Sequence, residues 1–305
     1  LQSFCQLECE GIQWEILVAD NAGGDEAKGV VVQFTEQLPV SLIVEPHLGK
    51  SNALNAAMAK ASGELYLFTD DDVVVDPKWL VSSWEGASIY PHHAVFGGRI
   101  LPKFPDGIHL ENLPIDFSHT RVKGCYAIAD SESHEGVFHP WMIFGPNWAM
   151  RAELYGQGHR FRTDIGPGTE LIVGEETELA YRLHEAGCEM AYLPQSIVYH
   201  KIRPEQLSVR WLNRRVFLSG QSWALNGKIP QVPFLFGVPR YLYKSVVIKG
   251  AQYLLSFLQA NRQAQFHAGL TYWFEKGYVY QFWKGLLSEP SSAQSPASLN
   301  KPQSS

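Results

Sequence analysis

The sequence is poor in cysteine, contains no long apolar run and has no surplus of basic residues, and each shortage excludes a class of protein. Its 305 residues include 4 cysteines, with no Cys-x-x-Cys and no Cys/His cluster at zinc-like spacing. This excludes a disulfide framework and a structural zinc site, and we expect a reducing, cytoplasmic compartment. No run of about 18 uncharged apolar residues is present, so we expect no membrane-spanning helix, and the first residues lack the pattern of a secretory signal.

The charge balance excludes another class of protein. Lysine and arginine total 25 against 31 aspartate and glutamate, which gives a formal net charge of -6 and a pI near 6.0. A nucleic-acid-binding protein needs a basic footprint that this composition lacks, so we expect no nucleic acid partner. Any anionic ligand must then be held by a few local residues or through a metal ion. Apolar residues make up 45% of the chain, which is ample for a packed core.

Short apolar runs alternate with amphipathic or small-residue stretches over the first two thirds of the chain. This pattern is typical of an α/β fold in which crossover helices join parallel strands. We expect strands at residues 14–19, 40–44, 65–69, 94–101 and 189–200. In sheets of this type ligands bind beyond the carboxyl ends of the strands, which directs attention to the residues that follow each strand.

Three helices are expected between these strands. The first has Ser51 as its N-cap and Gly63 as its stop, the second opens at Pro77, and the third spans residues 175–186. Residues 102–140 lack clear periodicity, so we expect a long loop or an irregular insertion there.

Three consecutive aspartates, Asp70, Asp71 and Asp72, follow the strand at 65–69 directly. Like charges at this spacing raise each other's pKa and resist burial, a conflict that a bound divalent cation resolves. Carboxylate oxygens suit Mg²⁺ or Mn²⁺ in a site that leaves coordination positions open for phosphates. The alternative is a solvated acidic turn before the next helix.

A strand followed by Asp-x-Asp also opens the haloacid dehalogenase-type phosphatases, in which the first Asp is the nucleophile. This class is an alternative for the acidic triplet. Those enzymes place the motif on the first strand of the domain, whereas two expected strands precede Asp70 here.

Four segments, taken in order, resemble the family 2 glycosyltransferases, which have the A-type nucleotide-sugar transferase fold. They are WEILVADNAGGD, HLGKSNALNAAMAKASGELYLFTDDDVVVDPKWL, FGPNWAMRAELY with FRTDIG, and GEETELAYRLHEAGCEMAYLPQSIVYH. The resemblance covers residues 14–200 and implies a Rossmann-like, mostly parallel sheet. It also implies an inverting enzyme that moves a sugar from a nucleotide diphosphate sugar to a hydroxyl acceptor, with Mn²⁺ or Mg²⁺ as cofactor, in cell-surface glycan or glycolipid assembly.

The resemblance implies a role for each site residue. Glu176 is the base that takes the proton from the acceptor hydroxyl, and Glu175 contacts the acceptor or orients its neighbour. Asp72 and His200 are metal ligands, and Asp70 contacts the ribose or reaches the ion through water. The residues expected to bind the nucleotide sugar are Asp20, Lys50, Asn52, Asp70 and Asp71, and those expected to shape the sugar and acceptor pocket are Asn147 and Trp148.

Several of these residues have a structural alternative. Lys50 is also consistent with a solvated residue at a helix start, His200 with a hydrogen-bonded structural imidazole, and Trp148 with a core residue. Glu178 is expected to pair with Arg182 at i,i+4. Asp164, in the loop before the helix, is the next candidate for the base after Glu175 and Glu176.

The sequence departs from the family pattern in three places. The family's first strand would lie before Leu1, so the sequence looks N-terminally truncated. The family usually has Glu-Asp where this chain has Glu175 and Glu176, which makes the base one methylene longer. Processive members carry Gln-x-x-Arg-Trp, whereas one more residue separates Gln206 from Arg210 here, which argues against a polymer synthase. A noncatalytic nucleotide-sugar binder is the other alternative to an active enzyme.

Composition divides the chain at residue 205. Residues 1–205 are expected to form the catalytic domain, and residues 206–287 a helical appendage in which Lys and Arg interleave with aromatic residues. This pattern is typical of helices in a membrane interface and equally of helices that pack aromatics on a core, so peripheral contact with the inner face of the plasma membrane is one of two interpretations. Residues 288–305, rich in Ser and Pro, are expected to be a disordered tail.

Overall fold

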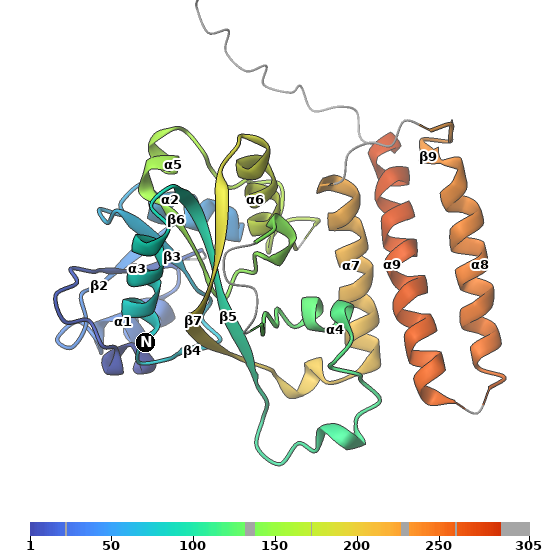
Figure 1. The fold of residues 1–305 in the computed structure, drawn as a ribbon, viewed down its shortest axis with the longest axis horizontal. Coiled ribbons are helices and arrows are strands. Elements are labelled where there is room, and N and C mark those ends of the chain that lie inside the picture. The colour runs from blue at the N-terminus through green and yellow to red at the C-terminus, as the bar shows by residue number, and fades with distance from the viewer. Residues whose placement is uncertain (22, 132–137, 172, 227–231, 260, 288–305) are drawn as a thin grey trace, which may run out of the picture.

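The computed structural model describes residues 1–21, 23–131, 138–171, 173–226, 232–259 and 261–287 (Figure 1). A short turn of 3-10 helix, η1 (Gln2–Gln6), precedes a two-stranded parallel sheet. Its strands are β1 (Ile16–Asp20) and β2 (Val40–Val44), and α1 (Asp25–Val32) connects them. Both strands predicted in this part of the sequence are confirmed.

A five-stranded sheet forms the centre of the molecule, with the strand order β3-β6-β5-β7-β4. The strands are β3 (Leu65–Phe68), β4 (Val73–Val75), β5 (His93–Lys103), β6 (Trp148–Arg151) and β7 (Glu189–Lys201). The α/β class is confirmed. The β1–β2 and β5–β7 ladders are parallel and hold most of the paired strand residues, whereas the shorter ladders of β3 with β6, β5 with β6 and β4 with β7 are antiparallel. No helix separates β3 from β4, and an irregular segment rather than one crossover helix leads to β6, so the crossover rule does not apply to these strands.

Three helices pack on the sheets and position the chemistry. They are α2 (Lys50–Met58), α3 (Trp79–Ile89) and α6 (Glu175–Glu185). The prediction that Ser51 is the N-cap of the first is wrong, because the helix begins one residue earlier, after Gly49, and the Ser51 hydroxyl donates instead to the carbonyl of Ile165 at 2.8 Å.

The core of the N-terminal part lies between α6 and the sheet. Leu179 and Leu183 of α6 are fully buried against Val95 of β5 and Met150 of β6. The irregular segment predicted at 102–140 is largely confirmed in the described residues, which form η2 (Leu110–Asn112), α4 (Thr120–Cys125) and η3 (Pro140–Met142), while α5 (Ala152–Gly156) follows β6.

The C-terminal part is helical, as expected. It contains η4 (Pro204–Gln206), α7 (Val209–Asn226), the hairpin β8 (Phe234–Leu235) and β9 (Val238–Pro239), α8 (Arg240–Ser256) and α9 (Arg262–Leu287). In Figure 1, α9 lies between α7 and α8, and α8 forms the outer edge of the molecule. None of the described helices is long and apolar enough to cross a membrane. The predicted tail at 288–305 lies outside the described residues.

Glycine allows α7 and α9 to approach closely. A Cβ on Gly277 would lie 1.9 Å from the carbonyl oxygen of Phe217, and a Cβ on Gly220 would lie 2.1 Å from that of Phe274. No larger residue fits at either position without moving a helix. The division of the chain at residue 205 remains a prediction, since the helices share a buried cluster with α4 and with Ile202 after β7.

Candidate active site

Asp72 and His200 lie side by side because of the register of two strands. β4 pairs with β7 so that Val73 is opposite His200, and the backbone N–H of Lys201 donates to the carbonyl of Asp72 at 2.9 Å. The Nε2 atom of His200 is 3.5 Å from Oδ1 of Asp72. The structure therefore brings together two residues that are 128 positions apart in the chain and that the sequence predicts as metal ligands.

The other ring nitrogen of His200 determines what Nε2 can do. Nδ1 lies 2.9 Å from the carbonyl oxygen of Tyr126, and since a carbonyl only accepts, Nδ1 carries a proton and donates. In a neutral ring Nε2 is then an acceptor that faces a carboxylate oxygen. Two acceptors cannot bond to each other, so a proton or a metal ion is needed between them. Burial favours a lower pKa for His200, but its hydrogen bond to Asp72 and the charge of that residue outweigh it, and the pKa is raised.

Asp70 has a different partner. The Nζ atom of Lys50 lies 2.7 Å from Oδ1 of Asp70 and 3.3 Å from Oε1 of the buried Glu175. Burial alone lowers the pKa of Lys50, but the carboxylates around it outweigh this effect and the pKa is raised. Lys50 is therefore an ammonium ion that joins two carboxylates, not a solvated residue at a helix start.

The pairing of Asp70 with Lys50 changes the predicted metal site. Within the residues that the structure describes, no group of three or more His, Cys, Asp and Glu side chains is placed to hold a metal ion. Asp70 is directed toward Lys50, which leaves Asp72 and His200 as the adjacent pair.

Glu176 has one carboxylate oxygen without a hydrogen-bond partner among the described residues. Its Oε1 accepts a hydrogen bond from the backbone N–H of Gly145 at 3.1 Å, while its Oε2 is buried and has no hydrogen-bond partner among the described residues. Burial and the charge of Glu175, offset in part by Lys50, raise the pKa of Glu176 to about 8. A buried oxygen that lacks a donor and belongs to a group with a pKa in this range is suited to accept a proton.

A pocket connects these charged groups to an aromatic surface. Its lining residues include Lys50, Asp70, Glu175 and Glu176 on the polar side and Phe68, Trp148 and Phe161 on the apolar side. The rings of Phe68 and Trp148 stack with centroids 4.3 Å apart, and Phe161 meets both edge-on. Trp148 is buried, as the alternative interpretation of this residue expects, and it also lines the pocket.

The structure does not support a pocket role for the Asn147 side chain. Its Nδ2 donates to the carbonyls of Arg99 and Ser196, and its Oδ1 accepts from Nε1 of Trp79 at 2.9 Å. The amide is buried and its hydrogen bonds hold β5, β7 and α3 together. The Gly-Pro break before Asn147 is typical of a ligand-binding loop, but the Asn147 amide forms its hydrogen bonds within the core.

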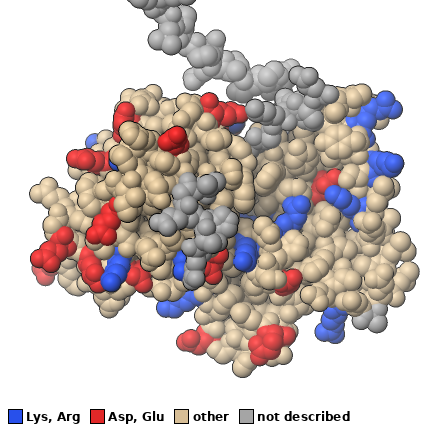
Figure 2. Space-filling view, viewed as in Figure 1, with Lys and Arg blue, Asp and Glu red and all other residues tan. Residues whose placement is uncertain are grey.

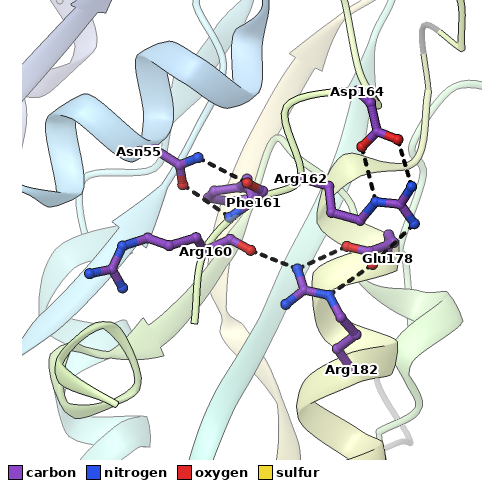
Figure 3. Close-up of polar contacts among 7 residues, drawn as sticks. All are labelled: Asn55, Arg160, Phe161, Arg162, Asp164, Glu178 and Arg182. Atoms are coloured by element: carbon purple, nitrogen blue, oxygen red, sulfur yellow. Dashed lines mark hydrogen bonds and ion pairs between the residues drawn. The ribbon is translucent and has the colours of Figure 1, made fainter. Parts of the chain in front are cut away.

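The loop that leads to α6 is clamped between two helices (Figure 3). Asn55 of α2 forms two hydrogen bonds with the backbone of Phe161, at 2.9 and 3.0 Å. Arg182 of α6 donates to the carbonyl of Arg160 at 2.6 Å and forms the predicted i,i+4 pair with Glu178 at 2.8 Å. These contacts fix the position of Phe161, which enters the pocket.

Asp164, the next candidate for the base, has a partner of its own. Arg162 donates to both of its carboxylate oxygens, at 3.0 and 2.6 Å (Figure 3). The pKa of Asp164 is lowered by this hydrogen bond to Arg162, despite some burial. A carboxylate held in this way is a weaker base than Glu176.

Two glycines bring the loop at 165–168 onto the start of α2. A Cβ on Gly168, where φ is +91°, would lie 2.9 Å from the Cα of Gly49. The backbone N–H of Lys50 donates to the carbonyl of Pro167 at 2.9 Å. Because the backbones touch here, the loop sets the direction in which Lys50 leaves the helix.

The helical appendage supports the same loop from the other side. Leu218 of α7 packs on the buried residues of the loop, and the Cβ that Gly174 lacks would lie 2.2 Å from Oγ of Ser222. Lys284 of α9 pairs with Glu170. The loop that precedes Glu175 and Glu176 is thus held between α2 and α7.

The remaining predicted donor contacts lie around the start of α2. Asp20 ends β1, and its neighbour Asn21 bonds to the carbonyl of His47 and the N–H of Gly49, which places the end of β1 beside α2. Asn52 uses its Nδ2 to donate to the carbonyl of Leu48 at 2.9 Å. Asp71 is exposed, unlike Asp70 and Asp72.

Sequence reasoning missed the groups that act through their backbone. The carbonyl of Tyr126 and the N–H of Gly145 orient His200 and Glu176, and neither carries a side-chain signal. Asn21 and Asn55 could have been noticed, since an asparagine after a strand or inside a helix is suited to bind backbone groups of a neighbouring loop.

Comparisons with known proteins agree with the resemblance seen in the sequence. Residues 1–135 match the sequence model of glycosyl transferase family 2. The succinoglycan biosynthesis protein ExoM of Rhizobium meliloti (strain 1021) is 26% identical over 223 residues, which cover 70% of this chain and 65% of that protein. The probable glycosyltransferase YdaM of Bacillus subtilis (strain 168) is 23% identical over 229 residues, 69% of this chain and 48% of that protein. The chain thus spans about half to two thirds of the length of these relatives.

One solved structure has the same fold over most of the chain. It is the mannosyltransferase PcManGT from Pyrobaculum calidifontis in complex with GDP-Man and Mn²⁺, with a TM-score of 0.59 and 19% sequence identity over 93% of this chain and 82% of that one. This similarity confirms the A-type glycosyltransferase fold.

Proposed function

Because residues 1–135 match the sequence model of glycosyl transferase family 2, we propose that the chain transfers a sugar from a nucleotide diphosphate sugar to a hydroxyl acceptor with inversion at the anomeric carbon. The observation that carries this proposal is the carboxylate of Glu176. One of its oxygens is held by Gly145, and the other is buried with no hydrogen-bond partner among the described residues. A positioned carboxylate of this kind can take the proton of an attacking hydroxyl.

The proposed reaction is a single displacement. The acceptor oxygen attacks the anomeric carbon from the face opposite to the leaving group and forms the new C–O bond. The bond between the anomeric carbon and the phosphate oxygen breaks, and the nucleoside diphosphate leaves with the electron pair. Glu176 receives the hydroxyl proton, while Lys50 compensates the charges of Glu175 and Asp70 beside it.

We assign the binding of a divalent cation, Mn²⁺ or Mg²⁺, to Asp72 and His200. The donor set fits, because Nδ1 of His200 is held by the carbonyl of Tyr126 and Nε2 faces a carboxylate oxygen. An imidazole ligand favours Mn²⁺ over Mg²⁺. A bound cation would offset the charge on the departing diphosphate. The Mn²⁺ in the structure of PcManGT supports this assignment.

The donor is proposed to lie across the start of α2. Asp20 at the end of β1 would contact the base or ribose, with Asn52, Asp70 and Asp71 nearby, and the aromatic surface formed by Phe68, Trp148 and Phe161 would face the sugar or acceptor. The relative named for succinoglycan biosynthesis supports a place in cell-surface glycan or glycolipid assembly. We propose the catalytic part to be residues 1–205.

A donor screen tests the proposal. The protein is incubated with Mn²⁺ and a panel of UDP- and GDP-sugars, and free nucleoside diphosphate is measured. We expect release from at least one donor, and release slower by about 100-fold or more from Glu176→Gln under the same conditions. Binding of a donor without release in the wild type would favour the noncatalytic binder instead.

The phosphatase alternative loses its support in the structure. Its nucleophile would be Asp70, which forms a 2.7 Å ion pair with Lys50, and residues 1–135 match the model of a different family. Hydrolysis of a simple aryl phosphate at a rate comparable to donor turnover would reverse this conclusion.

A further inference from the structure

The outer side of α8 is apolar where a surface helix is normally polar. Val247 and Leu254 of α8 have 68% and 70% of their surface exposed, Leu258 just after the helix has 83%, and Ile248 and Leu255 are also exposed. These positions recur with helical spacing and form one stripe along the side of α8 that faces away from α9. An exposed apolar stripe of this kind marks an interaction surface.

Basic residues continue the stripe toward the start of the helix. Arg240 and Lys244 are exposed and lie one turn apart on the same side, and α8 contains no acidic residue. Cations in the first turns of a helix are disfavoured by the helix dipole, so these two residues do not serve the stability of α8.

An apolar hairpin tip lies beside this end of the helix. Phe234, Leu235 and Phe236 are exposed, and Phe236, with 76% of its surface accessible, sits at the turn. The hydroxyl of Tyr243 donates to the carbonyl of Leu235 at 2.9 Å, which fixes the tip against α8. The tip, Arg240, Lys244 and the apolar stripe therefore form one continuous surface, called the α8 face below.

The charge of the whole appendage matches that of the α8 face. Residues 206–287 contain ten Lys and Arg and one acidic residue, Glu275, whereas residues 1–205 contain 14 basic and 29 acidic residues. Figure 2 shows acidic side chains concentrated on the side of the catalytic part and basic ones over the C-terminal helices. The molecule is therefore electrostatically polarised, with its basic end at its exposed apolar helix.

We propose that the α8 face docks on an anionic lipid surface, with its leucines and Phe236 in the headgroup region and Arg240 and Lys244 near the lipid phosphates. Apolar and basic groups on one exposed helix match such a surface in both respects. A second copy of the chain is a poor match, because pairing two α8 faces brings basic residues together with no acidic residue on either helix. The proposal goes beyond the proposed function and does not depend on it.

Vesicle flotation tests the apolar part of the α8 face. We expect the wild type to bind vesicles of phosphatidylcholine with phosphatidylglycerol and to bind phosphatidylcholine vesicles weakly. The double variant Leu254→Glu/Leu258→Glu should bind at least about 10-fold more weakly, because two apolar side chains no longer enter the lipid. Its matched control is Val32→Glu/Ile89→Glu, which makes the same change at exposed apolar positions of the catalytic part and should bind like the wild type.

The basic part is tested with Arg240→Gln/Lys244→Gln. Each lost charge should weaken binding to the anionic vesicles by about fivefold, and added salt should reduce the difference from the wild type. Lys60→Gln/Lys78→Gln, at exposed positions of the catalytic part, is the control.

Two outcomes would overturn the proposal. One is wild-type protein that does not bind the anionic vesicles, or that binds them as well after Leu254→Glu/Leu258→Glu. The other is a wild-type dimer in sedimentation that this double variant dissociates, without vesicle binding, which would make the α8 face an interface between copies. Either outcome leaves donor turnover, measured without vesicles, unchanged.

Discussion

The catalytic part and the helical appendage use their side chains in opposite ways. In residues 1–205 charged groups from distant segments converge into the interior, as Lys50 does with Asp70 and Glu175. In α8, apolar side chains face outward and few polar groups meet. The proposed chemistry of the first part therefore depends on the position of a few atoms, whereas the proposed lipid binding of the second depends on the composition of a surface.

The comparison also shows where the two parts depend on each other. The loop that precedes α6 contacts α7 through Leu218 and Ser222 and contacts α9 through the Glu170–Lys284 pair. The appendage is thus part of the scaffold for Glu176, even though its outer helix faces away. Substitutions chosen in each part can distinguish residues that affect sugar transfer from residues that affect only the stability of the fold.

The largest expected effect is loss of the proposed base. Glu176→Gln removes the proposed proton acceptor but keeps the shape of the side chain, so transfer should fall by about 100- to 10,000-fold while donor affinity is kept. Glu176→Asp restores the residue that is usual in the family and should remain active. The control is Glu185→Gln, an exposed residue of the same helix, and initial rates with calorimetric donor affinities give the answer. Wild-type transfer rates in Glu176→Gln would move the base to Glu175.

The next effect concerns the metal pair. Asp72→Ala should weaken Mn²⁺-dependent binding of the nucleoside diphosphate by more than about 10-fold, because His200 alone cannot hold the ion. Asp71→Ala, at an exposed neighbouring aspartate, should leave it unchanged. Calorimetry with Mn²⁺ and with EDTA measures both. Equal affinity of the wild type with and without metal would remove the metal site from the mechanism.

A smaller effect tests the scaffold. Gly277→Ala places a Cβ 1.9 Å from the carbonyl oxygen of Phe217, so α7 and α9 must separate, at a cost of about 1 to 3 kcal/mol. Gly29→Ala in α1 meets no atom within 4 Å and should instead stabilise the fold by up to about 1 kcal/mol. Thermal and urea unfolding measure both changes. A neutral Gly277→Ala would mean that the two helices are looser than the structure shows.

The smallest effect is the pH dependence of the wild type. The base must lose its proton, and the pKa of Glu176 is raised to about 8, so kcat/KM should rise as the pH passes through that value, by about tenfold between pH 7 and pH 9. The raised pKa also means that the native state binds this proton more tightly than the unfolded chain. Its contribution to stability is complete below the ordinary pKa of glutamate and is lost as the pH rises through about 8.

The pH dependence of activity and the pH dependence of stability both come from the Glu176 carboxylate. Activity should therefore increase with pH while stability decreases, and Glu176→Gln should remove this decrease in stability. If the stability of Glu176→Gln still decreases as the pH rises through about 8, this pH dependence belongs to another group.

Much of this architecture follows from local patterns in the sequence. The strands at 40–44 and 65–69, the helix with Leu179 and Leu183 buried, and the Glu178–Arg182 pair all depend on residues within one element, so periodicity and spacing predict them. The acidic residues Asp70, Asp71 and Asp72 stand out in the sequence because they closely follow the apolar run of β3.

Other features depend on contacts between distant segments, which local patterns do not contain. Ser51 does not cap its helix, and its hydroxyl donates instead to the carbonyl of Ile165, more than a hundred residues away. The direction of the Asp70 side chain depends on its ion pair with Lys50. The Asn147 amide is held in the core by hydrogen bonds to two backbone carbonyls and one indole N–H, all from other elements. The antiparallel direction of β6 also depends on distant segments, since it is decided by where the long segment after β5 returns to the sheet.

The ladder between β4 and β7 limits how the length of this chain can vary. Val73 is opposite His200, and adjacent residues of a strand point to opposite faces of a sheet. Inserting or deleting a single residue within Val73–Val75, or in β7 just before His200, would turn one partner of the Asp72–His200 pair to the other face. Substitutions in these strands can be absorbed, but changes in length cannot. The described residues of the segment between β5 and β6 form no such ladder, so we expect insertions in related sequences to accumulate there and to be absent from β4.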